Sequence, residues 1–185
     1  MRRTKLAALM MTLLLLSACG KTEQAGFEEL RTSVAGATGA EVTAKVTADL
    51  GDKVREYTIR FTGDAEGCVM EVLEPSLIAG VRARITGAAH TLEYDGLVLD
   101  TGEFTEDGPT AITALPLLMQ AIAQGHVDNT WTDKGTMGAT LVPDDELRVA
   151  LTLDSDTKAP SYAEIIDGET GRTLVKCEIQ EFALT

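Results

Sequence analysis

The feature that most constrains the fold of this 185-residue chain is a strict alternation of apolar and polar residues from Glu41 to Leu50. Valine, alanine and leucine occupy the even positions of this segment, and charged residues or threonine occupy the odd positions. Successive side chains of a β-strand point to opposite faces of a sheet, so the pattern predicts a strand with one buried face. The chain is therefore expected to build a sheet that is covered on one side.

The same period of two recurs along most of the chain, in short segments separated by turn residues such as Gly51-Asp52 and Asp95-Gly96. No repeat or linker interrupts the pattern, so residues 24–185 are expected to form one domain. About ten antiparallel strands are predicted, at residues 41–50, 57–62, 68–73, 81–86, 90–94, 97–99, 136–142, 147–154, 161–167 and 172–183.

Two segments follow a helical period instead. Near the N-terminus, Phe27, Leu30 and Val34 predict a short helix. Residues 110–124 predict a second one, which begins near Pro116 because proline fits the first turn of a helix but not its interior. This second helix is apolar on most sides, so it must be largely buried.

Together these elements predict a mainly β (α+β) fold, in which a curved antiparallel sheet forms an unclosed β-barrel. Aromatic residues make up only 4% of the chain, and small side chains cannot fill so wide an interior. The apolar helix is expected on the concave side, where an apolar ligand would share the space. The candidate ligand-binding residues are Val46, Tyr57, Ile59, Phe61, Met70, Ile85, Leu92, Tyr94, Leu115, Leu118, Met119 and Ile122.

The N-terminus has the layout of an export signal. Basic residues precede an apolar run from Leu6 to Leu16, which is too short to span a membrane. The sequence Leu16-Ser17-Ala18-Cys19 then resembles the lipobox of bacterial lipoproteins. The resemblance implies that residues 1–18 are a signal peptide and that Cys19 receives a diacylglycerol carrying chains such as palmitate. Residues 19–23 are then expected to be a short lipidated tether.

The charge of the chain limits its partners. Cleavage would remove three basic residues and no acidic ones, so the net charge would fall from −13 to −16. Such a surface repels nucleic acid and anionic headgroups. Attachment to the extracytoplasmic face of a cell membrane is therefore expected to depend on lipid. Gly20 follows Cys19, so the motif does not favour inner-membrane retention and leaves an outer membrane open.

Three short motifs carry a resemblance to a known family. They are Val72-Leu73-Glu74-Pro75, Leu92-Glu93-Tyr94-Asp95-Gly96, and Gly108-Pro109 leading into the apolar helix. With the order of strands and helices, they make the chain similar to the LolA/LolB-like superfamily of lipoprotein carriers. This resemblance implies an unclosed barrel, with helices over its mouth and an apolar cavity for acyl chains.

One departure from that family concerns its lipoprotein carrier, which has an arginine inside the barrel. Here the strand arginines fall on outward positions, which argues against a shuttling role. These arginines are Arg60, Arg82, Arg84 and Arg148.

Two functions are therefore expected as alternatives. The first is an envelope lipoprotein that binds a lipid or acyl chain. The second is a non-catalytic regulatory or scaffold lipoprotein that holds an envelope protein partner, as in signalling or spore germination. No catalytic or metal-binding motif is present in the sequence, so no enzyme, metal or cofactor is expected. His90 is interpreted as a core or rim residue, and the acidic clusters as solvated turns.

Three features allow two interpretations each. Cys68 and Cys177 are expected to be buried free thiols, with a disulfide as the alternative. Trp131, in a predicted loop, is either a lid over the core or an anchor for a partner. Leu77 and Ile78 lie in the connection between two predicted strands. They either fold back as core or form a membrane-contacting or gating loop at the barrel mouth.

Overall fold

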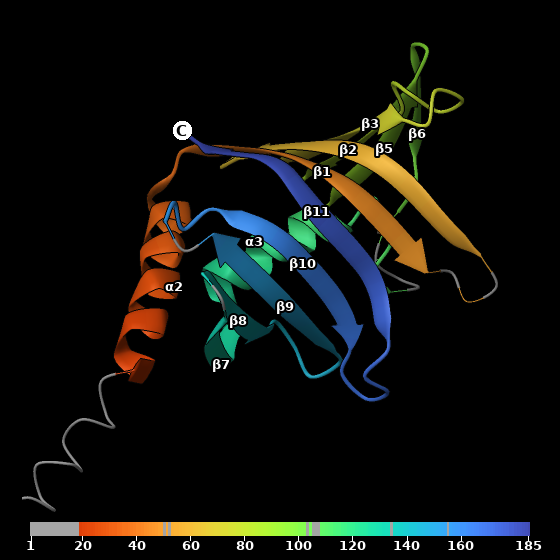
Figure 1. Cartoon of the computed structure of the whole chain (residues 1–185). Coiled ribbons are helices and arrows are strands. Elements are labelled where there is room, and N and C mark those ends of the chain that lie inside the picture. The colour runs from red at the N-terminus through yellow and green to blue at the C-terminus, as the bar shows by residue number, and fades with distance from the viewer. Residues whose placement is uncertain are drawn as a thin grey trace, which may run out of the picture.

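Figure 1 shows the computed structural model of the chain. It describes residues 19–49, 51, 53–102, 104, 108–133, 135–154 and 156–185, with side chains from Gln24 onward. The predicted signal peptide, and the lipobox residues before Cys19, lie outside the described residues.

Eleven described strands form one antiparallel sheet in the order β6-β5-β4-β3-β2-β1-β11-β10-β9-β8-β7. The first and last strands of the chain, β1 and β11, pair at its centre, and the two edges do not meet, so the predicted unclosed barrel is confirmed (Figure 1). The strands are β1 Gly39–Asp49, β2 Val54–Asp64, β3 Cys68–Glu74, β4 Arg82–Thr86, β5 Ala89–Tyr94, β6 Leu97–Asp100, β7 His126–Asp133, β8 Thr136–Val142, β9 Leu147–Asp154, β10 Pro160–Asp167 and β11 Thr173–Leu184.

The alternation in β1 orients its side chains as predicted. Val42, Ala44, Val46 and Ala48 are all buried on the concave face. The pairing of β1 with β11 shifts register between Thr43 and Ala44. Because such a bulge bends and twists a strand, it helps to curl the sheet.

Strand β7 was not predicted, since a loop containing Trp131 was expected there. Its burial does not alternate, so period-two reasoning could not detect it. Trp131 pairs with Gly138 of β8, and a Cβ atom at Gly138 would lie 2.2 Å from the indole ring. The half-buried ring therefore lies over this glycine. Because the flanking Met137 and Ala139 point into the core, Gly138 and Trp131 lie on the convex face, so the interpretation of Trp131 as a lid over the core is wrong.

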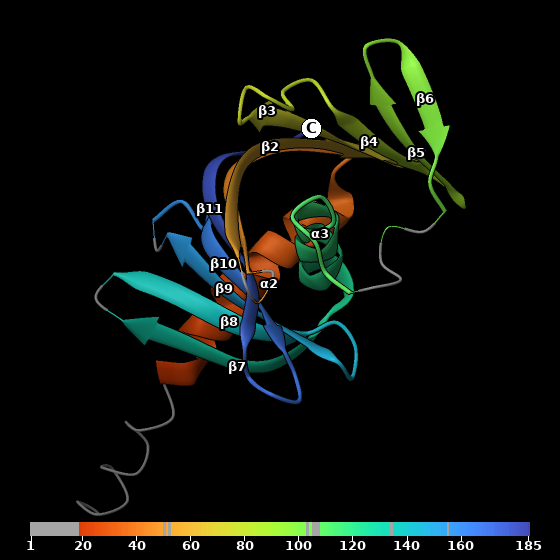
Figure 2. The same ribbon diagram turned by 90° about the vertical axis from the view of Figure 1, so that its right-hand side faces the viewer.

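Two helices are described, α2 Cys19–Gly36 and α3 Ala114–Gln124. Figure 2 shows α3 inside the curve of the sheet, as predicted. It begins two residues before Pro116, which therefore lies in its first turn. Helix α2 includes Cys19, so residues 19–23, predicted to be a short tether before the first helix, are helical in the structure.

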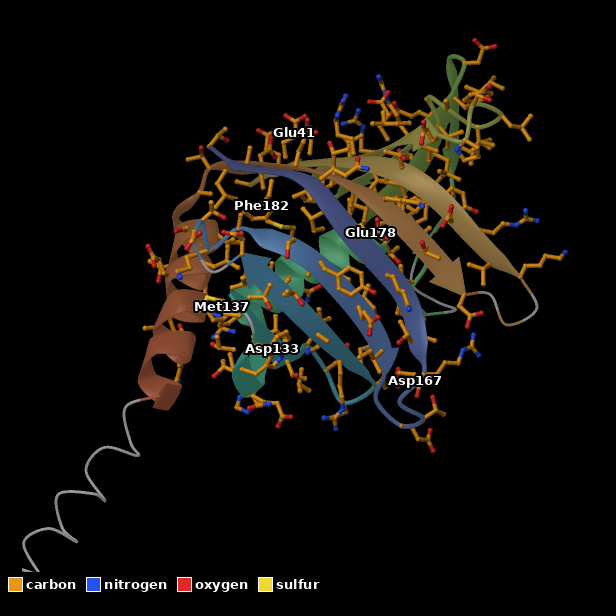
Figure 3. The ribbon with its side chains drawn as sticks, viewed as in Figure 1. Glu41, Asp133, Met137, Asp167, Glu178 and Phe182 are labelled. Carbon is orange, nitrogen blue, oxygen red and sulfur yellow. The ribbon has the colours of Figure 1, made fainter. Side chains whose placement is uncertain are left out.

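Helix α2 closes one end of the half-barrel by packing against α3, β7 and β8. Figure 3 labels Met137 of β8 beside α2, and a Cβ atom at Gly26 would lie 2.8 Å from the Met137 methyl carbon. Gly26 thus lets the helix approach the sheet closely.

Arg31 fastens α2 to the end of α3. Its Nε donates to the Ile122 carbonyl at 3.0 Å, and its Nη2 donates to the Gly125 carbonyl at 2.5 Å. Its guanidinium also lies 4.8 Å from the centre of the Phe27 ring. Arg31 therefore caps α3, since the last carbonyls of a helix lack intrahelical partners and attract cations.

The four arginines predicted to point outward lie on the convex face. Each forms an ion pair with a carboxylate of another strand, and Figure 3 labels one of these partners, Glu41, on the outer surface. The pairs are Arg60–Glu41 at 3.4 Å, Arg82–Glu71 at 3.0 Å, Arg84–Glu93 at 3.2 Å and Arg148–Asp128 at 3.7 Å.

Candidate functional site: an apolar pocket at the mouth of the half-barrel

Helix α3 fills the middle of the concave face. Five of the twelve predicted ligand-binding residues are fully buried there and line neither pocket described below, so they form the core. They are Val46, Met70, Leu115, Leu118 and Ile122. The predicted open interior is therefore divided, and the two pockets described here lie towards the two ends of α3.

The first space, which we call the mouth pocket, lies where the chain enters α3. It has a volume of about 320 Å³. Three predicted ligand-binding residues, Tyr57, Ile59 and Leu92, line it together with Ile78 of the predicted gate. The other lining residues are Ala48, Val72, Val81, Thr110, Ala111 and Ile112.

Among the described residues, no charged side chain lines the mouth pocket, and the side-chain polar groups of its lining are the hydroxyls of Tyr57 and Thr110. Thr110 belongs to a turn that starts α3, where its N–H donates to Thr113 Oγ1 at 2.8 Å. Pockets of about 300–1,000 Å³ with apolar walls and few polar groups are typical of small-molecule sites. This pocket therefore suits an apolar chain.

The second space, which we call the end pocket, lies where α2 meets the sheet. Phe61 and Met119, two more predicted residues, line it beside Val34 and Cys68. Its volume is about 570 Å³, and it is more open to solvent than the mouth pocket. The sequence-based prediction therefore assigned residues of two separate pockets to a single cavity.

Solved structures resemble this arrangement throughout its length. An uncharacterised conserved protein from Thermus thermophilus aligns with a TM-score of 0.50 and 14% identity, over 88% of this chain and 86% of its own. A putative outer membrane lipoprotein-sorting protein domain from Vibrio parahaemolyticus gives 0.49 and 10%, over 86% and 91%. A LolA superfamily protein from Nitrosomonas europaea gives 0.45 and 11%, over 88% and 93%.

The chain shares its overall fold with the Thermus thermophilus protein. No protein-family model and no curated protein matches its sequence. At identities this low, the likeness concerns the fold alone.

The two residues of the predicted gate differ from each other in exposure. Leu77 is 86% exposed, so the interpretation of Leu77 as core is wrong. Ile78 is half-buried in the wall of the mouth pocket. Their connection is an ordered turn, in which the Ile78 N–H donates to the Pro75 carbonyl at 3.1 Å and the Gly80 N–H donates to the Val72 carbonyl at 2.8 Å.

The last two predicted ligand-binding residues line neither pocket. Ile85 is half-buried on β4, and Tyr94 is 50% exposed at the end of β5. Ile85 packs against the margin of the core, whereas Tyr94 does not contact it. An inward position on a strand therefore did not guarantee a position in the cavity.

His90 has a structural role in this region. Its Nδ1 accepts a hydrogen bond from the Phe104 N–H at 3.2 Å, and the two rings lie 5.2 Å apart. These contacts hold the connection from β6 to α3 against β5. Among the described residues, no group of three His, Cys, Asp or Glu side chains is arranged to hold a metal ion.

Both cysteines in the described part of the domain are free thiols, as expected. Burial raises the pKa of the Cys177 thiol to about 12 and also raises that of Cys68. Strands β1 and β2 separate β11 from β3. Three steps of about 4.8 Å exceed the 7 Å or so that a disulfide can bridge between Cα atoms.

The carboxylates of the acidic turns accept hydrogen bonds from backbone N–H groups of the same turns. The Asp167 carboxylate accepts hydrogen bonds from the Thr170 N–H at 2.7 Å and the Glu169 N–H at 3.1 Å. The Thr170 N–H chiefly lowers the pKa of Asp167, and the Thr157 N–H does the same for Asp154. These clusters stabilise turns, as predicted. Of the described helices, none has the length and apolar character needed to cross a bilayer.

Proposed function

We propose that this protein is an extracytoplasmic lipoprotein, anchored by lipid on Cys19, that binds one apolar chain of a lipid in the mouth pocket. The observation that carries this proposal is the mouth pocket itself, a space of about 320 Å³ whose described lining residues are mostly apolar and include no charged one. Burial of an apolar chain there is favourable, by roughly 25 cal/mol for each Å² removed from water. A polar headgroup would remain outside.

The position of α3 supports a small cargo. The core side chains of this helix occupy the centre of the concave face, so a chain that enters at the mouth cannot extend to the end pocket. We therefore expect one acyl chain for each protein molecule. Ile78, in the wall beside the exposed Leu77, is placed to act as a gate.

The proposal is tested by filling each pocket separately. Ala111 lines the mouth pocket and Ala123 lines the end pocket, and both are half-buried. Fluorescence titration of the full chain with cis-parinaric acid should show weaker binding for Ala111→Leu and unchanged binding for the matched control Ala123→Leu. The reverse pattern, or equal binding by both variants, would contradict the proposal.

Anchoring is tested independently. Cys19→Ser should leave an uncleaved or soluble precursor that incorporates no radioactive palmitate in cells. A variant that still carries lipid and sediments with membranes would show that Cys19 is not the acceptor.

The alternative role, as a lipoprotein that holds a protein partner, is favoured by a separate observation. The β5–β6 hairpin exposes apolar side chains, and it lies at the opposite end of the molecule from the start of α2 (Figures 1 and 2). If lipid anchors the chain at Cys19, this hairpin points away from the bilayer and towards other envelope components.

A further inference from the structure

Strand β6 is an unusually apolar edge. It forms one margin of the sheet (Figure 2), and its Leu97, Val98 and Leu99 side chains are 70%, 62% and 63% exposed. Edge strands of soluble proteins usually carry charges, prolines or bulges that prevent pairing with other chains. Three consecutive exposed apolar residues at such an edge indicate an interaction surface.

The register places this surface beside the mouth pocket. Leu99 lies opposite Leu92, which lines the pocket, and Leu97 lies opposite Tyr94. Directly opposed residues point to the same face of a sheet. Tyr94, Leu97 and Leu99 therefore extend the concave apolar face beyond α3, whereas Val98 points to the convex face.

The hydrogen-bond pattern leaves polar backbone groups of β6 available. The Thr101 N–H donates to the His90 carbonyl at 3.1 Å, which identifies these two residues as a hydrogen-bonded pair. Such pairs alternate along an antiparallel ladder, so Leu99 and Leu97 also bond to β5. The N–H and C=O groups of Val98 and Asp100 then point outward, where no strand lies among the residues that the structure describes.

Charge selects among the possible occupants of this edge. Asp95 and Asp100 stand exposed at the two ends of β6, and the mature chain would carry a net charge of −16, three lower than the −13 of the full sequence. A second copy would bring the same negative charges to the edge, and like charges across an interface are unfavourable. A segment with lysine or arginine on both sides of an apolar stretch would be complementary.

We propose that β6 docks an extended segment of another envelope protein, which adds to the sheet as a further strand. The segment has alternating apolar residues and basic flanks. Its backbone bonds to Val98 and Asp100, and its apolar side chains cover Leu97 and Leu99. This proposal does not depend on lipid in the mouth pocket.

The test uses the full chain in nanodiscs of zwitterionic lipid and a fluorescein-labelled peptide. In the peptide, four valines alternate with threonines, and two lysines stand at each end. Val98→Pro removes an outward N–H but no bond to β5, and proline is tolerated at such edge positions. The matched control Val98→Thr keeps the N–H.

Fluorescence anisotropy should show that Val98→Pro weakens peptide binding by about tenfold or more, as the loss of a strand hydrogen bond and its geometry would produce. Val98→Thr should bind within about threefold of the unmodified chain, because it retains the backbone donor. Binding should also weaken with added salt, and a peptide with glutamate in place of lysine should bind poorly.

Three results would overturn the proposal. The first is equal binding of the peptide by Val98→Pro and Val98→Thr. The second is equal affinity for the lysine and glutamate peptides. The third is a dimer in sedimentation experiments that Val98→Pro dissociates, which would make a second copy the occupant. Because the peptide carries no acyl chain, none of these results bears on lipid binding in the mouth pocket.

Discussion

Single residues decide how the two helices meet. Arg31 was not singled out by sequence reasoning, since an arginine on a short amphipathic helix is ordinarily a solvated residue. Only the fold brings it to the Ile122 and Gly125 carbonyls, more than ninety positions away in the chain. A hydrogen bond from a charged group to a partly buried carbonyl stabilises more than an exposed ion pair does.

Arg31→Met should therefore lower the free energy of unfolding by about 1–3 kcal/mol, since it keeps the apolar stem but leaves both carbonyls without their donor. The matched control Arg60→Met loses only an exposed pair with Glu41 and should cost less than about 1 kcal/mol. Urea denaturation measures both. Equal losses would show that Arg31 does not cap α3.

The exposure of two leucines predicts how much each contributes to stability. Leu77→Ser should change the free energy of unfolding by no more than about 0.5 kcal/mol, because the Leu77 side chain is already in water. Leu118→Ala should cost about 2–5 kcal/mol, because Leu118 is fully buried on α3. Thermal unfolding of the two variants provides the check. A large loss of stability in Leu77→Ser would show that the Leu77 side chain belongs to the core.

The acidic turns predict a pH effect with a definite sign. The folded-state pKa of Asp167 is lowered by the Thr170 N–H, so its contribution to stability is present above the unfolded pKa of about 3.9. It disappears as the pH falls through the lower, folded pKa. Asp167→Asn should therefore reduce the loss of stability on acidification below about pH 4. Parallel acid-unfolding curves for variant and parent chain would contradict this.

At the scale of elements, the sequence predicts correctly the helices and strands whose apolar residues recur with a regular period. Strand β1, with buried Val42 and Val46, and helix α3, with buried Leu115 and Leu118, are where the pattern placed them. Strand β7 was missed because its pairing with β8 gives its side chains no regular burial. The helical state of residues 19–23 was missed because no apolar period covers them.

The candidate site was harder to predict than the fold. Alternation tells which face of a strand points inward, but not whether a helix already fills the space there. Met70 and Leu92 have equivalent phases, yet Met70 lies in the core and Leu92 lines the mouth pocket. The difference depends on where α3 begins and ends, and therefore on tertiary packing.

The whole molecule is a half-barrel with α3 as an internal plug, closed at one end by α2. Its mouth pocket lies between the start of α3 and the inner face of strands β1, β2, β3 and β5, and the apolar edge of β6 continues the same face. The proposed site for an apolar chain is therefore separate from the proposed site for a protein segment. Cys19, the proposed site of the lipid anchor, is the first residue of α2, at the opposite end of the molecule from β6 (Figure 1).

The most direct test of the central claim is to map where a lipid chain binds. The full chain would be irradiated with a photoactivatable diazirine fatty acid, digested, and analysed by mass spectrometry. We predict labels on residues of the mouth pocket, among them Tyr57, Val72 and Ile112. Labels confined to Phe61 and Met119 of the end pocket, or an unlabelled domain, would contradict the account.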